Sequence, residues 1–382
     1  MKFLLAQINP VVGDLEGNAK KILYTASKAS SASADLVLTP ELSLWGYPAN
    51  DLLLKKNLIK SQGQILDQLA LDINNKYGNL SITVGIAEII NDSFFPNLYN
   101  SIALLESGEW KIIARKIILP TYEVFDEKRY FRSEEKVSVL TKKIKNKTWR
   151  IGFTICEDLW VNKDIEGRGI HKKNPIIDLK KKKVDILVNL SASPYTFKKL
   201  ELRSKVSICA AQYLQVPLIY VNQVGANDNL IFDGNSFILN KYGSKIKQLE
   251  SFSEDLCSWE INQTKLEKSK VESSEMSSIF GALVLGVRDY AKKCGFKTAL
   301  IGLSGGIDSA LVSAIATAAL GSNNIYCVSM PSKWNSSHSK NDAKDLAKRL
   351  KINFNTIPIE KLMTSFEESF FKSIDFEMAE IT

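Results

Sequence analysis

Short apolar runs alternate with helix-like patterns along most of this chain, and this alternation limits what the chain can fold into. The strand-like segments are residues 2–10, 35–42, 81–90, 150–155, 184–193 and 217–225. Helical patterns cover residues 18–30, 61–77 and 199–214, and residues 101–119 form a hairpin pattern that turns at Ser107 and Gly108. Some strand-like runs are wholly apolar and others alternate, which indicates a mixed sheet or two sheets covered by helices. We therefore predict an α/β fold.

A polar, aperiodic stretch at residues 261–275 interrupts this pattern, which then restarts. The restarted pattern contains a helix, a strand, an apolar helix and a strand, at residues 277–295, 298–303, 309–320 and 325–330. This order predicts a βαβ unit with a buried crossover helix. The chain of 382 residues exceeds one ordinary core. We predict two domains joined by a linker, with the first domain at 1–262, the linker at 263–275 and the second domain at 276–382.

The second domain is short for a fold of this kind. It has two clear strand patterns, and a doubly wound sheet of that size leaves an edge and a face uncovered. Either another chain covers them, or the sequence stops short of the full domain.

Cysteine usage and charge narrow the function classes. The five cysteines are scattered and form no CxxC pair, which argues against a disulfide framework and a zinc site and favours a cytoplasmic location. No run approaches about 20 apolar residues, so we predict no membrane span. The net charge is +8, and its densest run, Lys180 to Lys183, is typical of the solvated last turn of a helix. No aromatic residues interleave that run, so we predict no nucleic-acid partner.

Three chemically reactive residues, Glu41, Lys116 and Cys156, each follow a strand-like run, where α/β folds place their sites. A lone cysteine is usually a buried structural thiol, because a catalytic cysteine normally has a histidine beside it. The chain has two histidines, His338 in the second domain and His171 in a polar loop, and a pair of Cys156 with His171 stays open. A glutamate can instead act as the base, while a lysine ammonium depresses the pKa of a thiol and stabilises an oxyanion.

The segments TPELSLWGYP, RKIILPTYEVFDEKRYF and GFTICEDLW resemble the three signature segments of the nitrilase, or carbon–nitrogen hydrolase, superfamily. The resemblance covers residues 1 to about 260 and implies a four-layer α-β-β-α sandwich. It implies that Glu41 is the base, Lys116 the oxyanion-stabilising cation and Cys156 the nucleophile, with Glu127 as a supporting acid. The implied reaction is attack on an amide carbon, which forms a thioester on Cys156, releases ammonia and ends in hydrolysis.

A glycine-rich segment, IGLSGGIDSALV, follows a strand in the second domain and opens a helix. Adjacent glycines allow close backbone approach, and the N–H groups at a helix start can bind phosphate. The string is not GxGxxG, and no lysine follows it as in a P-loop. Asp308 beside a phosphate makes chemical sense where a metal ion bridges the two. For SGG alone, a plain strand–helix turn is an equal alternative.

The longer string SGGIDS resembles the pyrophosphate-binding loop of the ATP pyrophosphatase family, whose members adenylate a carboxylate or carbonyl and release pyrophosphate. This implies a Rossmann-like adenine-nucleotide hydrolase-type domain, incomplete here, with magnesium at Asp308. The implied ATP-binding residues are Gly302, Leu303, Ser304, Gly305, Gly306, Ile307, Asp308 and Ser309. The next segment, MPSKWNSSHSKNDAKDLAKRL, resembles that of NAD synthetases, except that Trp334 replaces the usual Tyr or Phe.

The combination resembles the glutamine-dependent NAD synthetases over essentially the whole chain. It implies that glutamine supplies ammonia, that MgATP activates deamido-NAD, and that the products are NAD, AMP and pyrophosphate, without a prosthetic group. It also implies that Tyr122, Ser193 and Lys199 hold glutamine and that the protein is a homo-oligomer. Members of that family continue well past residue 382, so we expect a fragment or truncated product, with an intact glutaminase and an incomplete synthetase.

Other functions stay open from the sequence. The main alternative is a stand-alone amidase or glutaminase of the nitrilase superfamily, whose truncated second segment is inactive and which shows no ATP dependence. Another glutamine-fed ATP pyrophosphatase would pair its synthetase with a Cys–His–Glu or N-terminal-Cys glutaminase, and neither is evident here. An inactive assembly subunit is a third possibility, and nucleic-acid binding a weak fourth.

Overall fold

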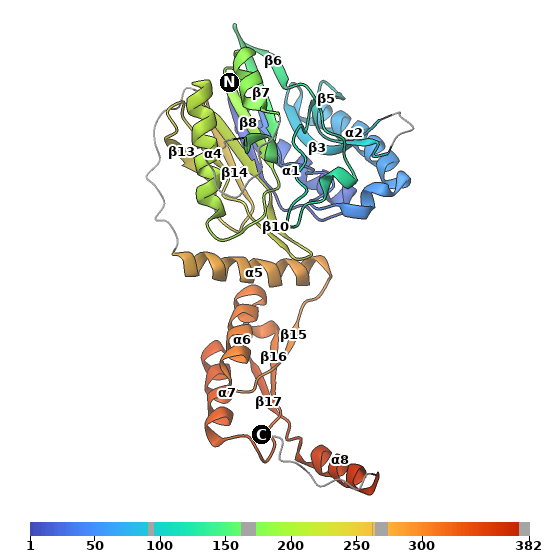
Figure 1. Cartoon of the computed structure of the whole chain (residues 1–382), viewed down its shortest axis with the longest axis vertical. Helices are drawn as coiled ribbons and strands as arrows, with labels where there is room; N and C mark the ends of the chain where they lie inside the picture. The colour runs from blue at the N-terminus through green and yellow to red at the C-terminus, as the bar shows by residue number, and fades with distance from the viewer. Residues whose placement is uncertain (91–94, 162–172, 262, 264–273, 374–382) are drawn as a thin grey trace. The chain divides into compact units, whose positions relative to one another are not determined.

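The computed structural model describes residues 1–90, 95–161, 173–261, 263 and 274–373 of the chain (Figure 1). It divides into two compact units, Met1–Glu275 and Met276–Thr382. Most of the predicted linker over 263–275 lies outside the described residues. No helix within the described ranges combines the length and apolar content that a membrane crossing requires.

Two six-stranded sheets form the centre of the first unit. The first sheet, in spatial order, contains β14 (Asp255–Glu260), β1 (Lys2–Gln7), β2 (Leu36–Leu38), β3 (Ser81–Ile89), β4 (Leu98–Glu106) and β5 (Glu109–Arg115). The second contains β13 (Lys245–Gln248), β12 (Phe237–Leu239), β9 (Leu218–Asn222), β8 (Ile186–Ser191), β7 (Lys147–Ile155) and β6 (Ser138–Ile144). A separate hairpin pairs β10 (Val224–Asn227) with β11 (Leu230–Asp233). Both sheets mix parallel and antiparallel pairs, as predicted.

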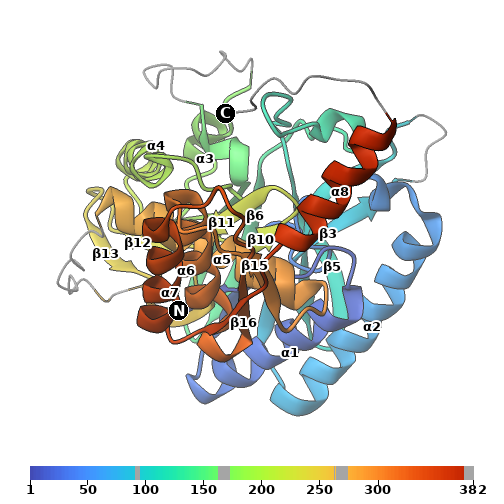
Figure 2. The same cartoon turned by 90° about the horizontal axis from the view of Figure 1, so that it is seen from below.

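Helices cover the outer face of each sheet. On the first sheet lie α1 (Leu15–Ser31) and α2 (Lys56–Tyr77), which run side by side (Figure 2). On the second lie α3 (Pro175–Lys181) and α4 (Lys199–Leu214). The described part of this unit also contains three short 3-10 helices, namely η1 (Asn50–Leu54), η2 (Glu127–Arg129) and η3 (Cys156–Leu159). The predicted four-layer α-β-β-α sandwich is thereby confirmed.

Strand β1 shows why the apolar runs of this unit are nearly continuous. Phe3 and Leu5 pack between the two sheets, whereas Leu4 and Ala6 pack beneath α1 and α2. Successive side chains of a strand point to opposite faces, so a strand buried on both faces is apolar at most of its positions.

Several local predictions hold at residue level. Helix α4 spans the predicted 199–214, and the hairpin β4–β5 turns at Ser107 and Gly108, whose φ values are 55° and 84°. Two positive φ angles suit the tight turn that joins twisted antiparallel strands. Lys180 and Lys181 occupy the last turn of α3, as the lysine run predicted.

The second unit contains a parallel sheet with the order β15 (Ala299–Gly302), β16 (Ile325–Ser329) and β17 (Asn353–Thr356). Its helices are α5 (Glu275–Lys293), α6 (Ile307–Leu320), α7 (Ser337–Leu350) and α8 (Glu360–Ser373), with a short 3-10 helix, η4 (Ser322–Asn324). The alternation of strands with α6 and α7 gives the Rossmann-like arrangement predicted for this part.

Two expectations for the second unit need correction. The crossover helix α6 is buried on one face only, because Ala316 packs in the core while Leu311 and Val312 are each 52% exposed. The sheet also has a third strand, β17, which the sequence did not predict, because NFNT is too short and polar to form an apolar run. The open face predicted for this sheet is present at Leu300, which is 75% exposed.

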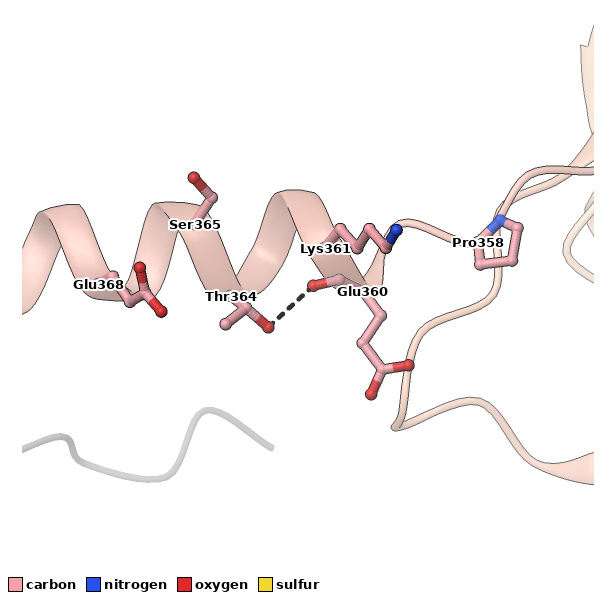
Figure 3. A pocket seen from close by; sticks show the side chains of 6 residues that line it. All are labelled: Pro358, Glu360, Lys361, Thr364, Ser365 and Glu368. Atoms are coloured by element: carbon pink, nitrogen blue, oxygen red, sulfur yellow. Dashed lines mark hydrogen bonds between the residues drawn. The ribbon is translucent and has the colours of Figure 1, made fainter.

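Helix α8 ends the described part of the chain. Its first turns are drawn in Figure 3, where the Thr364 hydroxyl donates to the Glu360 carbonyl at 3.0 Å. The side chains of Pro358, Glu360, Lys361, Thr364, Ser365 and Glu368 line a shallow pocket there. These side chains are of mixed charge and belong to a single helix and the turn before it, so we assign them no function.

Candidate active site

Four of the predicted residues meet where strands of the first unit end. Glu41 follows β2 by three residues, Lys116 follows β5, and Cys156 follows β7. The Lys116 Nζ atom lies 2.7 Å from Glu41 Oε1 and 2.7 Å from Glu127 Oε1. All four side chains are buried, Lys116 completely so. Residues 41, 116 and 127 therefore form a buried charge cluster, and the charges of this cluster act on the Cys156 thiol.

The charge state of Lys116 is set by its two carboxylate partners. Burial alone would lower the pKa of Lys116, because a charged amine loses its hydration. The negative charges of Glu127 and Glu41 outweigh this effect and raise the pKa of Lys116 well above its usual value. Lys116 is consequently an ammonium that can face a developing negative charge.

Glu127 carries less negative charge than an exposed glutamate. Burial raises the pKa of Glu127 to about 7, the Lys116 ammonium opposes this rise, and Glu41 adds to it. The Tyr47 hydroxyl donates to Glu127 Oε1 at 2.9 Å. The second oxygen, Oε2, has no hydrogen-bond partner among the described residues. Glu127 can therefore hold a proton near neutral pH.

We expect Glu127→Gln to change how stability depends on pH. A folded-state pKa of about 7 lies above the ordinary 4.5, so Glu127 contributes stability below pH 4.5 that is lost as pH rises through about 7. The parent should lose about 2 kcal/mol relative to Glu127→Gln between pH 5.5 and pH 8. Urea unfolding of the first unit, followed by fluorescence at both pH values, measures this difference. Identical pH profiles for the two proteins would contradict the assignment of the raised pKa.

Glu41 is fixed through both carboxylate oxygens. Oε1 accepts from Lys116 Nζ and from Asn100 Nδ2, each at 2.7 Å, and Oε2 accepts from the Ala192 N–H at 2.9 Å. Ala192 directly follows β8, so Glu41 of the first sheet is hydrogen-bonded to the second sheet. The carboxylate is held in one orientation, and its charge acts on the Cys156 thiol.

The sequence did not single out three groups of this site, namely Tyr47, Asn100 and the Ala192 N–H. Tyr47 lies inside the segment TPELSLWGYP that indicated Glu41. Asn100 interrupts the apolar strand β4, and it is fully buried. A buried asparagine needs a hydrogen-bond partner, so this polar residue in an apolar run could have indicated the site from the sequence. The Ala192 N–H carried none, because a backbone group becomes distinctive only after folding.

Cys156 is the first residue of η3, directly after β7. Its φ of 45° lies in the left-handed region, which residues with a side chain seldom adopt. Burial raises the pKa of the thiol well above its usual value, Glu41 raises it further, and Lys116 lowers it. The resting thiol is thus protonated and needs a base, and the Glu41 carboxylate and Lys116 ammonium are the charges that act most strongly on it.

No histidine lies among the described residues of the first unit. His171 lies outside the described residues, so the open pairing of Cys156 with His171 falls there as well. His338 belongs to α7 in the second unit and is exposed.

The three residues predicted to hold glutamine are tied to the segments around Cys156. The Tyr122 hydroxyl donates to Glu157 Oε2 at 2.9 Å, and Glu157 is the residue after Cys156. The Lys199 ammonium lies 5.0 Å from the centre of the Trp160 ring, at the end of η3. Ser193 is buried directly after Ala192. Tyr122 and Lys199 thus contact η3 and its C-cap residue, and Ser193 follows the residue whose N–H binds Glu41.

The glycine-rich segment joins β15 to α6 in the second unit, with Gly306 as the N-cap. Gly305 has a φ of 90°, and a Cβ atom there would lie 2.1 Å from the Ser339 carbonyl oxygen. The Ser304 hydroxyl accepts from the Gly306 N–H at 3.2 Å, and the Ser309 hydroxyl donates to the Gly306 carbonyl at 3.0 Å. Asp308 is exposed in the first turn of α6. Ser304, Gly306 and Asp308 are exposed at this turn, which leads into the N-terminus of α6, where backbone N–H groups can bind phosphate.

Known families match both units of the chain. The carbon–nitrogen hydrolase family matches residues 5–270, and the NAD synthase family matches residues 279–381. A glutamine-dependent NAD(+) synthetase from Synechocystis sp. is 43% identical to this chain over an alignment of 384 positions. The alignment covers 98% of this chain and 68% of that relative. The chain belongs to the glutamine-dependent NAD(+) synthetase family.

Further relatives agree with this membership. The glutamine-dependent NAD(+) synthetase of Thermotoga maritima is 34% identical, over 97% of this chain and 67% of its own length. A solved glutamine-dependent NAD+ synthetase from Acinetobacter baumannii, in complex with ADP, has a TM-score of 0.87 and 34% identity, covering 99% of this chain and 68% of that one. The chain thus spans about two thirds of the length of these family members.

A solved structure of lower identity has a similar fold. An amidase of the nitrilase superfamily from Nesterenkonia AN1 has a TM-score of 0.54 and 18% identity, over 68% of this chain and 89% of that one. At this identity the likeness concerns the fold alone. It agrees with the four-layer sandwich seen here.

Proposed function

We propose that the chain catalyses glutamine-dependent synthesis of NAD. The first unit hydrolyses glutamine at Cys156, and the ammonia is used for ATP-dependent amidation of deamido-NAD, which releases AMP and pyrophosphate. One observation carries the proposal: a protonated thiol, a held carboxylate and a buried ammonium act on one another in a chain that aligns almost completely with the family.

The glutaminase reaction follows from the roles of these groups. Glu41 accepts the proton of Cys156 as Sγ attacks the side-chain amide carbon of glutamine. The Lys116 ammonium stabilises the oxyanion of the tetrahedral intermediate. When the C–N bond breaks, Glu41 returns the proton to the leaving nitrogen, and ammonia departs from a γ-glutamyl thioester. Water activated by Glu41 then hydrolyses the thioester to glutamate and restores the thiol.

Glu127 supports this reaction without contacting the substrate in our proposal. It shares the Lys116 ammonium with Glu41 and is itself held by Tyr47. The pKa of Glu127 is about 7. When Glu127 is protonated it is neutral, so the positive charge of Lys116 is then balanced by fewer negative charges. Tyr122, Ser193 and Lys199 are the proposed glutamine contacts, which is supported by their attachment to the Cys156 and Glu41 segments.

The ATP site is proposed at residues Gly302 to Ser309. Support comes from the N–H groups and hydroxyls presented before α6 and from the ADP complex of the Acinetobacter baumannii relative. Asp308 is the proposed magnesium ligand. Within the described ranges no three His, Cys, Asp or Glu side chains gather to hold a metal by themselves. A lone carboxylate beside a phosphate site nevertheless fits Mg²⁺, which commonly binds through one carboxylate, substrate phosphates and water.

When bound, the ion would neutralise phosphate charge as pyrophosphate leaves. The chain's own loop supplies N–H donors and hydroxyls that orient the phosphates. A homo-oligomeric state stays a prediction from the family resemblance, and a cytoplasmic location stays a prediction from the scattered cysteines.

We expect Gly305→Ala to weaken ATP binding by at least about tenfold. Alanine at a φ of 90° is strained, and its Cβ would lie 2.1 Å from the Ser339 carbonyl, so the loop must move away from α7. Gly321→Ala, at the opposite end of α6, is the matched control, because its φ of 85° gives the same strain with no atom within 4 Å. Calorimetric titration with MgATP should show a loss for residue 305 only. Equal affinities in both variants would argue against an ATP site at this loop.

The proposal as a whole is tested on the unmodified chain. Ammonia release is measured with glutamine and with asparagine, and NAD formation is measured with deamido-NAD, MgATP and either glutamine or ammonium. We expect ammonia from glutamine in clear preference to asparagine, and NAD from both nitrogen sources. NAD formation by the unmodified chain would overturn the expectation, drawn from the sequence, of an incomplete synthetase. Ammonia release without any NAD formation would favour the stand-alone amidase, which the match of the second unit to NAD synthases disfavours.

A further inference from the structure

The carboxylate of Asp158 lies buried between two segments that carry proposed catalytic residues. Asp158 belongs to η3, two residues after Cys156, and is 2% exposed. Its Oδ1 atom accepts from the N–H groups of Ile117 and Ile118, at 3.0 and 2.7 Å. Its Oδ2 atom accepts from the N–H of Ile155 at 3.0 Å. One side chain thus accepts three backbone hydrogen bonds.

The three donors flank the proposed cation and nucleophile. Ile117 directly follows Lys116, and Ile155 directly precedes Cys156. Lys116 extends from β5 of the first sheet, whereas Cys156 extends from β7 of the second. The Asp158 carboxylate therefore joins the ends of two strands that no backbone ladder connects.

We propose that Asp158 is a positioning residue for the glutaminase reaction. Its carboxylate sets the separation between the Lys116 ammonium and the Cys156 thiol. The inference rests on the proposed function of Cys156 and Lys116. Asp158 itself contacts backbone groups and takes no part in proton transfer.

The backbone at Cys156 explains why such a tie is needed. A left-handed φ of 45° at a residue with a side chain persists only where the surroundings hold it. Asp158 holds the N–H immediately before Cys156, and Asn189 Nδ2 donates to the Cys156 carbonyl at 3.4 Å. The turn is fixed on both sides of the nucleophile, and the Asp158 tie also fixes the chain after Lys116.

The protonation of Asp158 agrees with this role. Burial raises the pKa of Asp158 to about 6, and hydrogen bonds from Ile155, Ile118 and Ile117 limit the rise. At neutral pH the side chain is therefore mainly a carboxylate, which only accepts hydrogen bonds. Three N–H donors need an acceptor of that kind on both oxygens.

Asp158→Asn tests the proposal because it keeps the shape and removes one acceptor. An amide has one acceptor oxygen, so its NH₂ group must face either Ile155 or the pair Ile117 and Ile118. Two measurements are made on the full chain. Alkylation of Cys156 by iodoacetamide is timed by peptide mass spectrometry, with exposed Cys209 as internal reference. Glutamine kcat and KM are measured separately.

We expect alkylation of Cys156 in Asp158→Asn to slow by at least about tenfold. We also expect kcat for glutamine to fall about 100-fold while KM changes less than about threefold, because the variant misplaces a reacting group and leaves substrate binding in place. Cys209 should react as in the parent. Asp178→Asn in α3, where the carboxylate pairs with exposed Lys181, is the matched control and should leave all these values unchanged. Ile22→Val in the α1 core controls for lost stability, and should lower Tm without slowing alkylation of Cys156.

If the role of Asp158 were purely electrostatic, the rate of Cys156 alkylation would change in the opposite direction. Loss of a negative charge near the thiol lowers its pKa and speeds alkylation, so a rate at or above that of the parent would overturn the proposal. If Asp158→Asn does not fold, Asp158→Glu decides, because it keeps the charge and displaces the oxygens by one methylene. Slow alkylation in that variant supports positioning, and a parental rate contradicts it. Alkylation needs no glutamine, so a parent chain that releases no ammonia would refute the proposed function alone.

Discussion

Cys156→Ala should lower ammonia release from glutamine by about 10⁴-fold or more, since no other group can form the thioester. NAD formation from deamido-NAD and MgATP should then fail with glutamine but continue with ammonium salts. The reason is that the thiol takes part only in releasing ammonia, whereas the phosphate-binding turn belongs to the second unit. Ammonia release and NAD formation are followed in the same samples.

Cys257→Ala provides the matched control for this result. Cys257 is a buried cysteine of β14 in the same unit, and it packs in the core between the sheets. Its loss should cost some stability and leave glutamine hydrolysis in place. Residual hydrolysis above about one per cent in Cys156→Ala would contradict the assignment of the nucleophile.

Lys116→Met should remove glutaminase activity and destabilise the first unit at the same time. Methionine leaves the buried carboxylates of Glu41 and Glu127 without the ammonium that both contact at 2.7 Å. Removal of one partner from a buried ion pair typically costs about 3–5 kcal/mol. Loss of the oxyanion-stabilising cation should lower kcat by about 10²–10³-fold in the fraction that remains folded. Urea unfolding and initial rates at pH 7.5 measure the two effects.

Two further variants separate the causes. Lys142→Met removes a lysine that pairs with Glu106 at a partly exposed site, and should cost no more than about 1 kcal/mol. The double variant Glu127→Gln, Lys116→Met should regain part of the stability that Lys116→Met loses, because one unpaired carboxylate is removed. It should regain none of the activity. If Lys116→Met unfolds like the parent, then the buried charge cluster does not contribute to stability as we describe.

The sequence predicted best those features that depend on neighbouring residues. The span of α4 and the turn at Ser107 and Gly108 follow from local periodicity and turn chemistry. The strand ends that carry Glu41, Lys116 and Cys156 were visible because each reactive residue interrupts or ends an apolar run. The sandwich itself was implied by family resemblance rather than by periodicity.

Features that depend on distant partners were missed. Strand β14 pairs with β1 across more than two hundred residues, and its sequence DLCSWE has a weak strand pattern without that partner. The hydrogen bond from Ala192 to Glu41 likewise spans 151 positions. In the sequence, Asp158 stands out only as the second of two acids that follow Cys156 in GFTICEDLW. Its role depends on Ile117 and Ile118, which the fold brings close, so it could not be assigned before the structure was known.

The covalent intermediate on Cys156 gives the sharpest test of the proposed chemistry. The parent chain is incubated with glutamine and hydroxylamine, which competes with water for the γ-glutamyl thioester. We predict γ-glutamyl hydroxamate in proportion to hydroxylamine, and a γ-glutamyl adduct on the Cys156 peptide after acid quench. Ammonia release from glutamine with neither hydroxamate nor adduct would contradict a cysteine nucleophile at this site.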